Sequence, residues 1–251
     1  MKKRIRKEHK SKTKYRNLLI MSFLMGALLI GGSVTAFSNF GKNNNNNADQ
    51  DAQTKRLISQ ITNASIPSAK ALGSNSSLID IVEFGDYQDP LSASFNNETK
   101  TELIINYVDP GLARFVFKDL IVNVSPQNTL STLAAEASYC AAEQNKYWEF
   151  HDEIFRNSKG EDTEWISKES LIGFAQNTGV NNTEQFSSCL DAHKYEQVVM
   201  NNDIFAKDLG FVSSPTFLII NTNSSKVAAF GGDQPFSVFK ETIDQLLNKT
   251  I

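Results

Sequence analysis

The pattern of hydrophobic and polar residues predicts a body in which short strands and longer helices alternate. Short runs rich in β-branched and aromatic residues, bounded by polar turns, are typical of buried strands. Such runs cover 78–84, 113–120, 216–220 and 226–230. Hydrophobic side chains three or four residues apart predict helices over 90–106 and 236–248, and a mostly helical stretch over 130–209 broken near 157–160 and 177–182. The order βαβ, a block of helices, then ββα predicts an α/β fold with a mixed sheet covered on both faces.

The amino-terminal residues follow a different pattern. Residues 1–16 contain nine Lys or Arg and one acidic residue, and residues 17–38 contain a run of 20 uncharged residues. Such a run is about as long as a helix needs to cross a bilayer, and basic residues before it favour a cytoplasmic amino terminus. We therefore expect a single-pass membrane anchor with the body on the extracytoplasmic side. The alternative is a signal segment cleaved after small residues near Ala36, which would leave the body secreted.

A polar linker, residues 39–71, joins this segment to the body. Residues 41–53 form a low-complexity tract rich in Asn, which predicts an unstructured tether. A short helix is expected over 54–70. The folded domain is then expected to cover 72–251, with the helical stretch of about 130–209 inserted into it.

Charge and motif content exclude several classes of function. Residues 17–251 hold 16 basic and 27 acidic side chains, and so acidic a body repels the phosphate backbone of nucleic acids. The three histidines, His9, His151 and His193, have no metal-ligand spacing with each other or with the cysteines. No glycine-rich phosphate loop precedes a predicted helix. We therefore expect no metal, no cofactor and no nucleic-acid partner.

The chain contains two cysteines, Cys140 and Cys189, which allow one intrachain disulfide. Disulfides persist outside the cytoplasm, where seven Asn-x-Ser/Thr sequons would also suit a glycosylated surface. Each cysteine falls on a hydrophobic helical face, so both thiols should point inward. Their bond would close a loop of about 50 residues, worth about 4 kcal/mol in the chain-entropy model. We expect a structural disulfide; two buried free thiols and a redox-active pair are the alternatives.

Several segments, in the same order, resemble the DsbA-type thioredoxin-fold family. They are IVEFGDYQ, FVFKDL, AAEASYCAAEQNKYWEFHDEIF, GFVSSPTFLI and GGDQPFSVF. The resemblance runs from about residue 72 to residue 247. It implies a thioredoxin-like fold with an inserted helical subdomain, and thiol–disulfide exchange as the activity of the family.

The resemblance breaks at the two positions that carry the family's redox cysteines. In that family the first cysteine begins the helix after a strand, where the helix dipole stabilises a thiolate, and the second lies one turn later. The matching residues here are Asp89 and Ser92, neither of which can form a disulfide. Asp89 is a favourable N-cap and Pro90 suits the first helical position. The stretch is therefore expected to be a stable helix start without a catalytic role.

Two further residues, Pro215 and Glu83, match family positions. Pro215 matches the family's cis-proline, so Ser214 and Pro215 are expected to present backbone to an extended substrate. Glu83 resembles the buried acid that moves protons beneath the cysteines. Burial should raise the pKa of Glu83, and Asp89 nearby should raise it further.

These observations lead to a prediction of function. We expect an anchored extracytoplasmic protein that binds protein or peptide clients, as a chaperone-like module without disulfide-exchange chemistry. One alternative is a thiol–disulfide oxidoreductase that acts through Cys140 and Cys189. A second is a glutathione-type transferase that uses Ser92, and a third is a structural subunit of an envelope complex.

Overall fold

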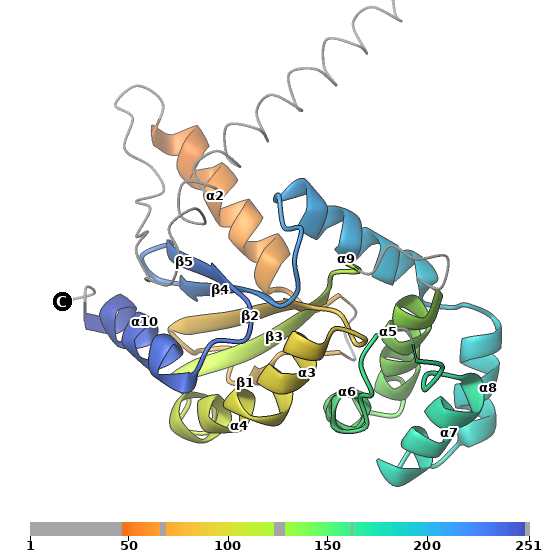
Figure 1. The fold of residues 1–251 in the computed structure, drawn as a ribbon. Coiled ribbons are helices and arrows are strands. Elements are labelled where there is room, and N and C mark those ends of the chain that lie inside the picture. The colour runs from red at the N-terminus through yellow and green to blue at the C-terminus, as the bar shows by residue number, and fades with distance from the viewer. Residues whose placement is uncertain (1–46, 66–68, 123–128, 162, 249–251) are drawn as a thin grey trace, which may run out of the picture.

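A computed structural model describes residues 47–65, 69–122, 129–161 and 163–248. Its centre is a five-stranded sheet in the order β1-β3-β2-β4-β5 (Figure 1). Strands β2 and β3 are parallel, and the other neighbouring pairs are antiparallel. The strands are β1 (Leu72–Gly73), β2 (Ile79–Gly85), β3 (Ala113–Asp119), β4 (Thr216–Asn221) and β5 (Lys226–Gly231).

The four predicted strands are confirmed, each to within one residue at either end. Strand β1 was not predicted, because two residues are too few to show a period. It pairs Leu72 with Phe115 and Gly73 with Arg114 at the edge of the sheet. The mixed α/β architecture predicted from the element order is therefore confirmed.

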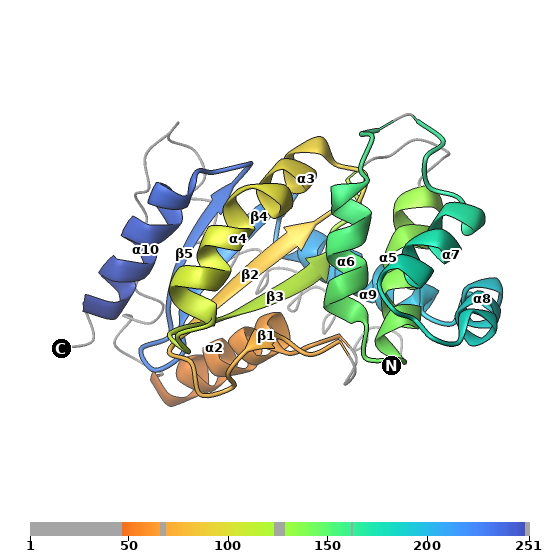
Figure 2. The same ribbon diagram turned by 90° about the horizontal axis from the view of Figure 1, so that it is seen from below.

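Three helices and a short π-helical turn cover one face of the sheet. Figure 2 shows α3, α4 and α10 in front of the strands. Their apolar side chains meet those of β2, β3 and β4 in a cluster centred on Phe95, Phe217 and Phe239. The elements are α3 (Pro90–Asn97), α4 (Thr99–Leu103), the π-helical η1 (Ile104–Val108) and α10 (Phe236–Asn248). The single helix predicted over 90–106 is thus divided.

The opposite face is covered by α2 (Asn47–Thr62) and α9 (Glu196–Asp208). Ile61 of α2 and Ala206 of α9 pack there against Val82, and the Lys118 ammonium donates to the Asn63 carbonyl at 2.6 Å. Helix α2 begins inside the tract predicted to be an unstructured tether, so that prediction was wrong from residue 47 onwards. Burial of apolar residues at its carboxyl end is the physical reason why the segment can be ordered.

The remaining helices form a block beside the sheet (Figures 1 and 2). They are α5 (Thr129–Ala142), α6 (Tyr147–Arg156), α7 (Lys168–Asn177) and α8 (Thr183–Asp191). With α9 they occupy the stretch between β3 and β4 that was predicted to be helical. Two breaks were not predicted, after α5 and after α8, where Asn145 and His193 adopt positive φ angles of 58° and 46°. Neither break has the glycine that usually marks such a position.

Within the described ranges, no helix combines the length and apolar character needed to span a bilayer. The predicted anchor, 17–38, and the basic segment before it lie outside the described residues. The anchor therefore stays a prediction.

The aromatic cluster under α3 offers a test of the fold. Phe95 is fully buried, with its ring centroid 4.4 Å from that of Phe217 and 5.4 Å from that of Phe239. We predict that Phe95→Ala lowers the free energy of unfolding by about 3–5 kcal/mol, since it leaves a cavity. Leu91→Ala, on the same helix but 49 % exposed, should cost less than about 1 kcal/mol. Urea unfolding measures both, and equal losses would contradict this packing.

Candidate functional site

The loop between β2 and α3 holds the positions that match the family's redox cysteines. Asp89 caps α3, because its carboxylate accepts from the Ser92 backbone N–H at 2.8 Å while Pro90 opens the helix. This confirms the predicted helix start. Asp86 fixes the loop from the other side, since its carboxylate accepts from the backbone N–H groups of Gln88 and Val122.

The loop before β4 meets this helix start. The Ser92 and Ser214 hydroxyl oxygens lie 2.7 Å apart, and Ser214 Oγ accepts from the Asp86 backbone N–H at 2.9 Å. The peptide bond between Ser214 and Pro215 is cis, as predicted. The structure therefore brings Asp89, Ser92, Ser214 and Pro215 together.

The side chains of Asp89 and Ser92 are buried, and no cysteine lies among the residues of this cluster. Ser92 is fully buried, and Asp89 is 7 % exposed. Burial raises the pKa of the Asp89 carboxyl, and hydrogen bonds from Ser92 and Ser214 act against that rise. A thiolate brought here would meet the carboxyl of Asp89 in place of a stabilising donor, so the geometry does not favour a glutathione site on Ser92.

Glu83 lies beneath the cluster and is fully buried. Desolvation raises its pKa to about 8, and the charge of Asp89 contributes to the rise. The Lys100 ammonium and the Asn96 amide, which donates to Glu83 Oε1 at 2.9 Å, lower that pKa in part. The predicted direction of the shift is confirmed, with burial as its main cause.

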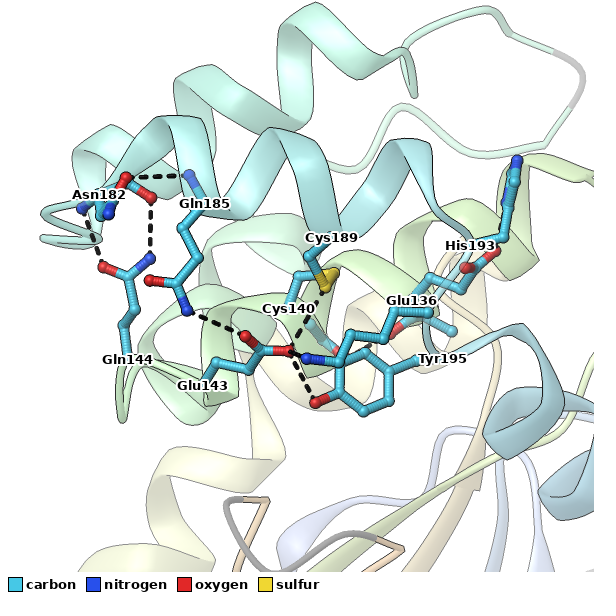
Figure 3. The surroundings of a disulfide bond; sticks show 12 residues. Glu136, Cys140, Glu143, Gln144, Asn182, Gln185, Cys189, His193 and Tyr195 are labelled. Carbon is cyan, nitrogen blue, oxygen red and sulfur yellow. Dashed lines mark hydrogen bonds and ion pairs between the residues drawn. A yellow bond between two sulfur atoms is a disulfide. The ribbon is translucent and has the colours of Figure 1, made fainter.

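Both cysteines of the chain lie in the helical block. Cys140 of α5 and Cys189 of α8 form a disulfide with a sulfur–sulfur distance of 2.04 Å (Figure 3). Cys140 is 1 % exposed and Cys189 is 6 % exposed, so both point inward as expected. Cys189 Sγ lies 3.7 Å from Glu143 Oε1, and both cysteines belong to the apolar cluster of the helical block.

Comparisons with known proteins agree with this architecture. The family model described as Thioredoxin matches residues 66–245. Disulfide bond formation protein D of Bacillus subtilis (strain 168) is 26 % identical over 185 residues, which cover 73 % of this chain and 79 % of that protein. This chain belongs to the DsbA-like thioredoxin-fold family.

Solved structures of DsbA-like proteins are similar in fold. Oxidised BdbD from Bacillus subtilis gives a TM-score of 0.64 at 24 % identity, covering 74 % of this chain and 96 % of that one. Wolbachia pipientis alpha-DsbA1 gives 0.62 at 20 % identity, covering 78 % of this chain and 96 % of that one.

The family relationship corrects the predicted function. A chaperone-like module without disulfide-exchange chemistry was expected because positions 89 and 92 of this DsbA-like chain lack sulfur. The relatives that match over most of the chain are disulfide bond formation proteins, and the chain carries a formed disulfide of its own. These findings overturn the chaperone-like prediction and favour the alternative, an oxidoreductase. The error came from giving the loss of sulfur at positions 89 and 92 more weight than the cysteine pair that was kept as an alternative.

One group of charges in this DsbA-like fold was missed by sequence reasoning. Lys100 is buried, forms an ion pair with Asp152, and lies 3.2 Å from His151 Nδ1 and 4.9 Å from the Trp148 ring centroid. His151 is fully buried, and desolvation together with Lys100 lowers its pKa to about 4. The sequence around Lys100 carries no signal for this burial, because lysines on predicted helices are usually exposed.

The raised pKa of Glu83 predicts a pH dependence of stability. The folded carboxyl keeps its proton up to about pH 8, whereas the unfolded one loses it near 4.5. The stabilisation from this group is therefore complete below about pH 4.5 and is lost as the pH rises through 8. We predict that Glu83→Gln becomes more stable relative to the wild type between pH 5 and pH 8, by up to about 1.4 kcal/mol per pH unit.

Urea unfolding at several pH values measures this difference. Glu149→Gln is the matched control, because Glu149 lies on the surface of α6 with half of its side chain exposed. Its difference from the wild type should be nearly constant with pH. A constant difference for Glu83→Gln as well would contradict the buried, protonated carboxyl.

Proposed function

We propose that this chain is a thiol–disulfide oxidoreductase of the DsbA class whose redox group is the disulfide between Cys140 and Cys189. That disulfide is the single observation that carries the proposal, since the chain has no other cysteines. Relatives named for disulfide bond formation support the class of reaction. Asp89 and Ser92 take no part in electron transfer.

Cys189 is the sulfur that a client attacks. It contacts the polar side chain of Glu143, and it is 6 % exposed whereas Cys140 is 1 % exposed. A client thiolate bonds to Cys189 Sγ, the sulfur–sulfur bond breaks, and Cys140 leaves and takes up a proton. A second client thiolate then attacks the client sulfur of this mixed disulfide and releases Cys189 as a thiol. The client loses two electrons and two protons, which the two cysteines gain.

The reduced pair must be oxidised again by a disulfide-bearing partner protein or a low-molecular-weight disulfide. Clients are reduced extracytoplasmic proteins or peptides. Their backbone contacts Ser214 and Pro215, whose positions match the substrate loop of the family. The cis peptide bond and the contact between Ser214 and Ser92 support a loop of fixed shape there.

The proposed location is the extracytoplasmic side of a membrane. Residues 17–38 form a retained single-pass anchor, and the basic residues 1–16 remain in the cytoplasm. The uncharged run of 20 residues supports this proposal, as does a disulfide, which persists in that compartment.

Single-turnover oxidation of a client tests the activity. We predict that the oxidised protein, mixed with a reduced secreted protein that has one native disulfide, converts client dithiol to disulfide while its own two cysteines become reduced. Cys189→Ser should abolish the transfer. Asp89→Asn should leave it unchanged, because asparagine keeps the helix cap. Mass spectrometry after alkylation counts the thiols on both proteins.

A lack of client oxidation would contradict the proposed function. Client thiols that stay reduced in the presence of the folded wild type would show that the disulfide is structural. The Cys140→Ser, Cys189→Ser double variant would then lose about 4 kcal/mol of stability, with no activity to lose.

Membrane attachment has its own test. We predict that the full chain, expressed in bacteria, stays in the membrane pellet after alkaline extraction, and that protease added outside the cell digests its body. A variant without residues 17–38 should remain soluble in the cytoplasm. Recovery of the wild type as a soluble secreted protein that lacks its first 36 or so residues would show cleavage instead.

A further inference from the structure

The two bonded cysteines lie at the carboxyl ends of their helices. Helix α5 ends at Ala142, just after Cys140, and α8 ends at Asp191, just after Cys189. Backbone carbonyl groups give this end of a helix a partial negative charge, which disfavours a thiolate. The helix amino terminus that would favour one is occupied by Asp89.

A carboxylate adds to this effect at Cys189. Glu143, one residue beyond the end of α5, places Oε1 3.7 Å from Cys189 Sγ. In the disulfide the sulfur has no hydrogen, so the contact is one of packing. Once the bond is reduced, the same sulfur becomes a thiol that can donate to the carboxylate. A thiolate there would place two negative charges next to each other.

Glu143 is held in its charged form. The Tyr195 hydroxyl and the Gln185 amide donate to its two oxygens at 2.9 and 3.0 Å, and the Lys194 ammonium lies 2.6 Å away (Figure 3). Burial alone would raise the pKa of Glu143, but these partners keep it below its ordinary value. The donors from Gln185, Lys194 and Tyr195 also fix the carboxylate in place beside the sulfur.

Two further pairs of charges involve the packed elements or the turn after α8. Lys168 of α7 binds Asp191 at 2.6 Å, and His193 lies 3.2 Å from Glu136 of α5. Lys194 is the cation that pairs with Glu143, and its side chain is 54 % exposed, so solvent weakens its field. Within the described part of the chain, Glu143 is thus the charged group in direct contact with Cys189 sulfur.

We propose that Glu143 keeps Cys189 protonated whenever the disulfide opens, and thereby denies the Cys140–Cys189 pair the thiolate stabilisation on which a strong oxidant depends. A dithiol pair becomes a strong oxidant when its reduced form is stabilised, usually as a thiolate. Here the carboxylate and both helix ends deny that stabilisation. The pair is therefore a weaker oxidant than one whose reduced form is a stabilised thiolate.

This inference rests on the proposed function and narrows the class of client dithiols that the protein oxidises. A weak oxidant converts only those client dithiols whose own disulfide is strongly favoured, as in a client that has already folded its cysteines into contact. Flexible or small dithiols, whose disulfides are less stable, would instead stay reduced.

The experiment compares the reactivity of the Cys189 thiol with and without the carboxylate. In the Cys140→Ser background, the rate of alkylation by iodoacetamide is measured from pH 6 to pH 10. We expect Glu143→Gln to lower the apparent thiol pKa and raise the rate at pH 7 by about threefold or more, since one pKa unit corresponds to about tenfold. Lys194→Gln should lower the rate, and Glu149→Gln, an exposed control on α6, should leave it unchanged.

A second measurement keeps both cysteines, so it does not depend on whether the Cys140→Ser variant folds. The wild type and Glu143→Gln, both with the two cysteines, are equilibrated in glutathione buffers at about pH 10, where the thiolate contributes to the reduced form, and the reduced fraction is read by mass spectrometry. Glu143→Gln should become reduced at a lower ratio of thiol to disulfide, by about threefold or more. An unchanged or lower alkylation rate at pH 7, or an unchanged equilibrium, would overturn the role of Glu143.

The proposed function and the role of Glu143 fail on different results. If Glu143→Gln shifts the thiol pKa but the wild type oxidises no client, the proposed function fails and the control of Cys189 by Glu143 stands. If the wild type oxidises a client and Glu143→Gln changes neither pKa nor equilibrium, the function stands and the role of Glu143 is wrong.

Discussion

The covalent bond between α5 and α8 is the constraint on which the chemistry of this chain depends. It joins residues 49 positions apart, so it removes much of the freedom of the unfolded chain and stabilises the block by about 4 kcal/mol in the chain-entropy model. Under the proposed function, the demands on this bond conflict, since it stabilises the fold and each turnover would open it. The conflict is smaller when the helices have other contacts that survive reduction.

Glu143 supplies such contacts. Its carboxylate accepts hydrogen bonds from Gln185 of α8 and from Tyr195 in the turn that follows, and it forms an ion pair with Lys194 of that turn. These three contacts connect the end of α5 to α8 and to the turn after it without any sulfur. Phe150 and Phe186 extend the connection into the apolar core, with ring centroids 5.4 Å apart. The geometry near Cys189 can therefore persist in the reduced state, where the carboxylate decides whether the thiol is charged. The same residue would hold the helices together and limit the oxidising power of the pair.

Much of the fold could be predicted from the sequence, because strands that are buried on both faces of a sheet consist of short apolar runs. Such runs located β2, β3, β4 and β5, and the cap at Asp89 located the start of α3. Other features leave no local signal. The break at His193 needs a left-handed residue where no glycine stands, and the division of 90–106 comes from the backbone at Glu98, which departs from the α-helical geometry.

The candidate sites also contain some features that the sequence indicates and others that leave no local signal. The meeting of Ser92 with Ser214 could be expected only through the family resemblance, since 122 residues separate them. The contact between Glu143 and Cys189, and the buried charge of Lys100, depend on long-range packing that no spacing encodes. The resemblance also misled, because it directed attention to two positions where sulfur is absent and away from the pair where it is present.

Helix electrostatics explain why the position of the sulfur matters more than its presence. At the amino terminus of α3 the dipole would stabilise a thiolate, but there it meets the Asp89 carboxyl, whose hydrogen bonds use the same donors. At the carboxyl ends of α5 and α8 the dipole opposes a thiolate, and Glu143 opposes it further. A chain with its cysteines at this end of two helices cannot gain oxidising power from helix dipoles. Under the proposed function, electrons would enter the pair from clients whose disulfides are more stable than its own.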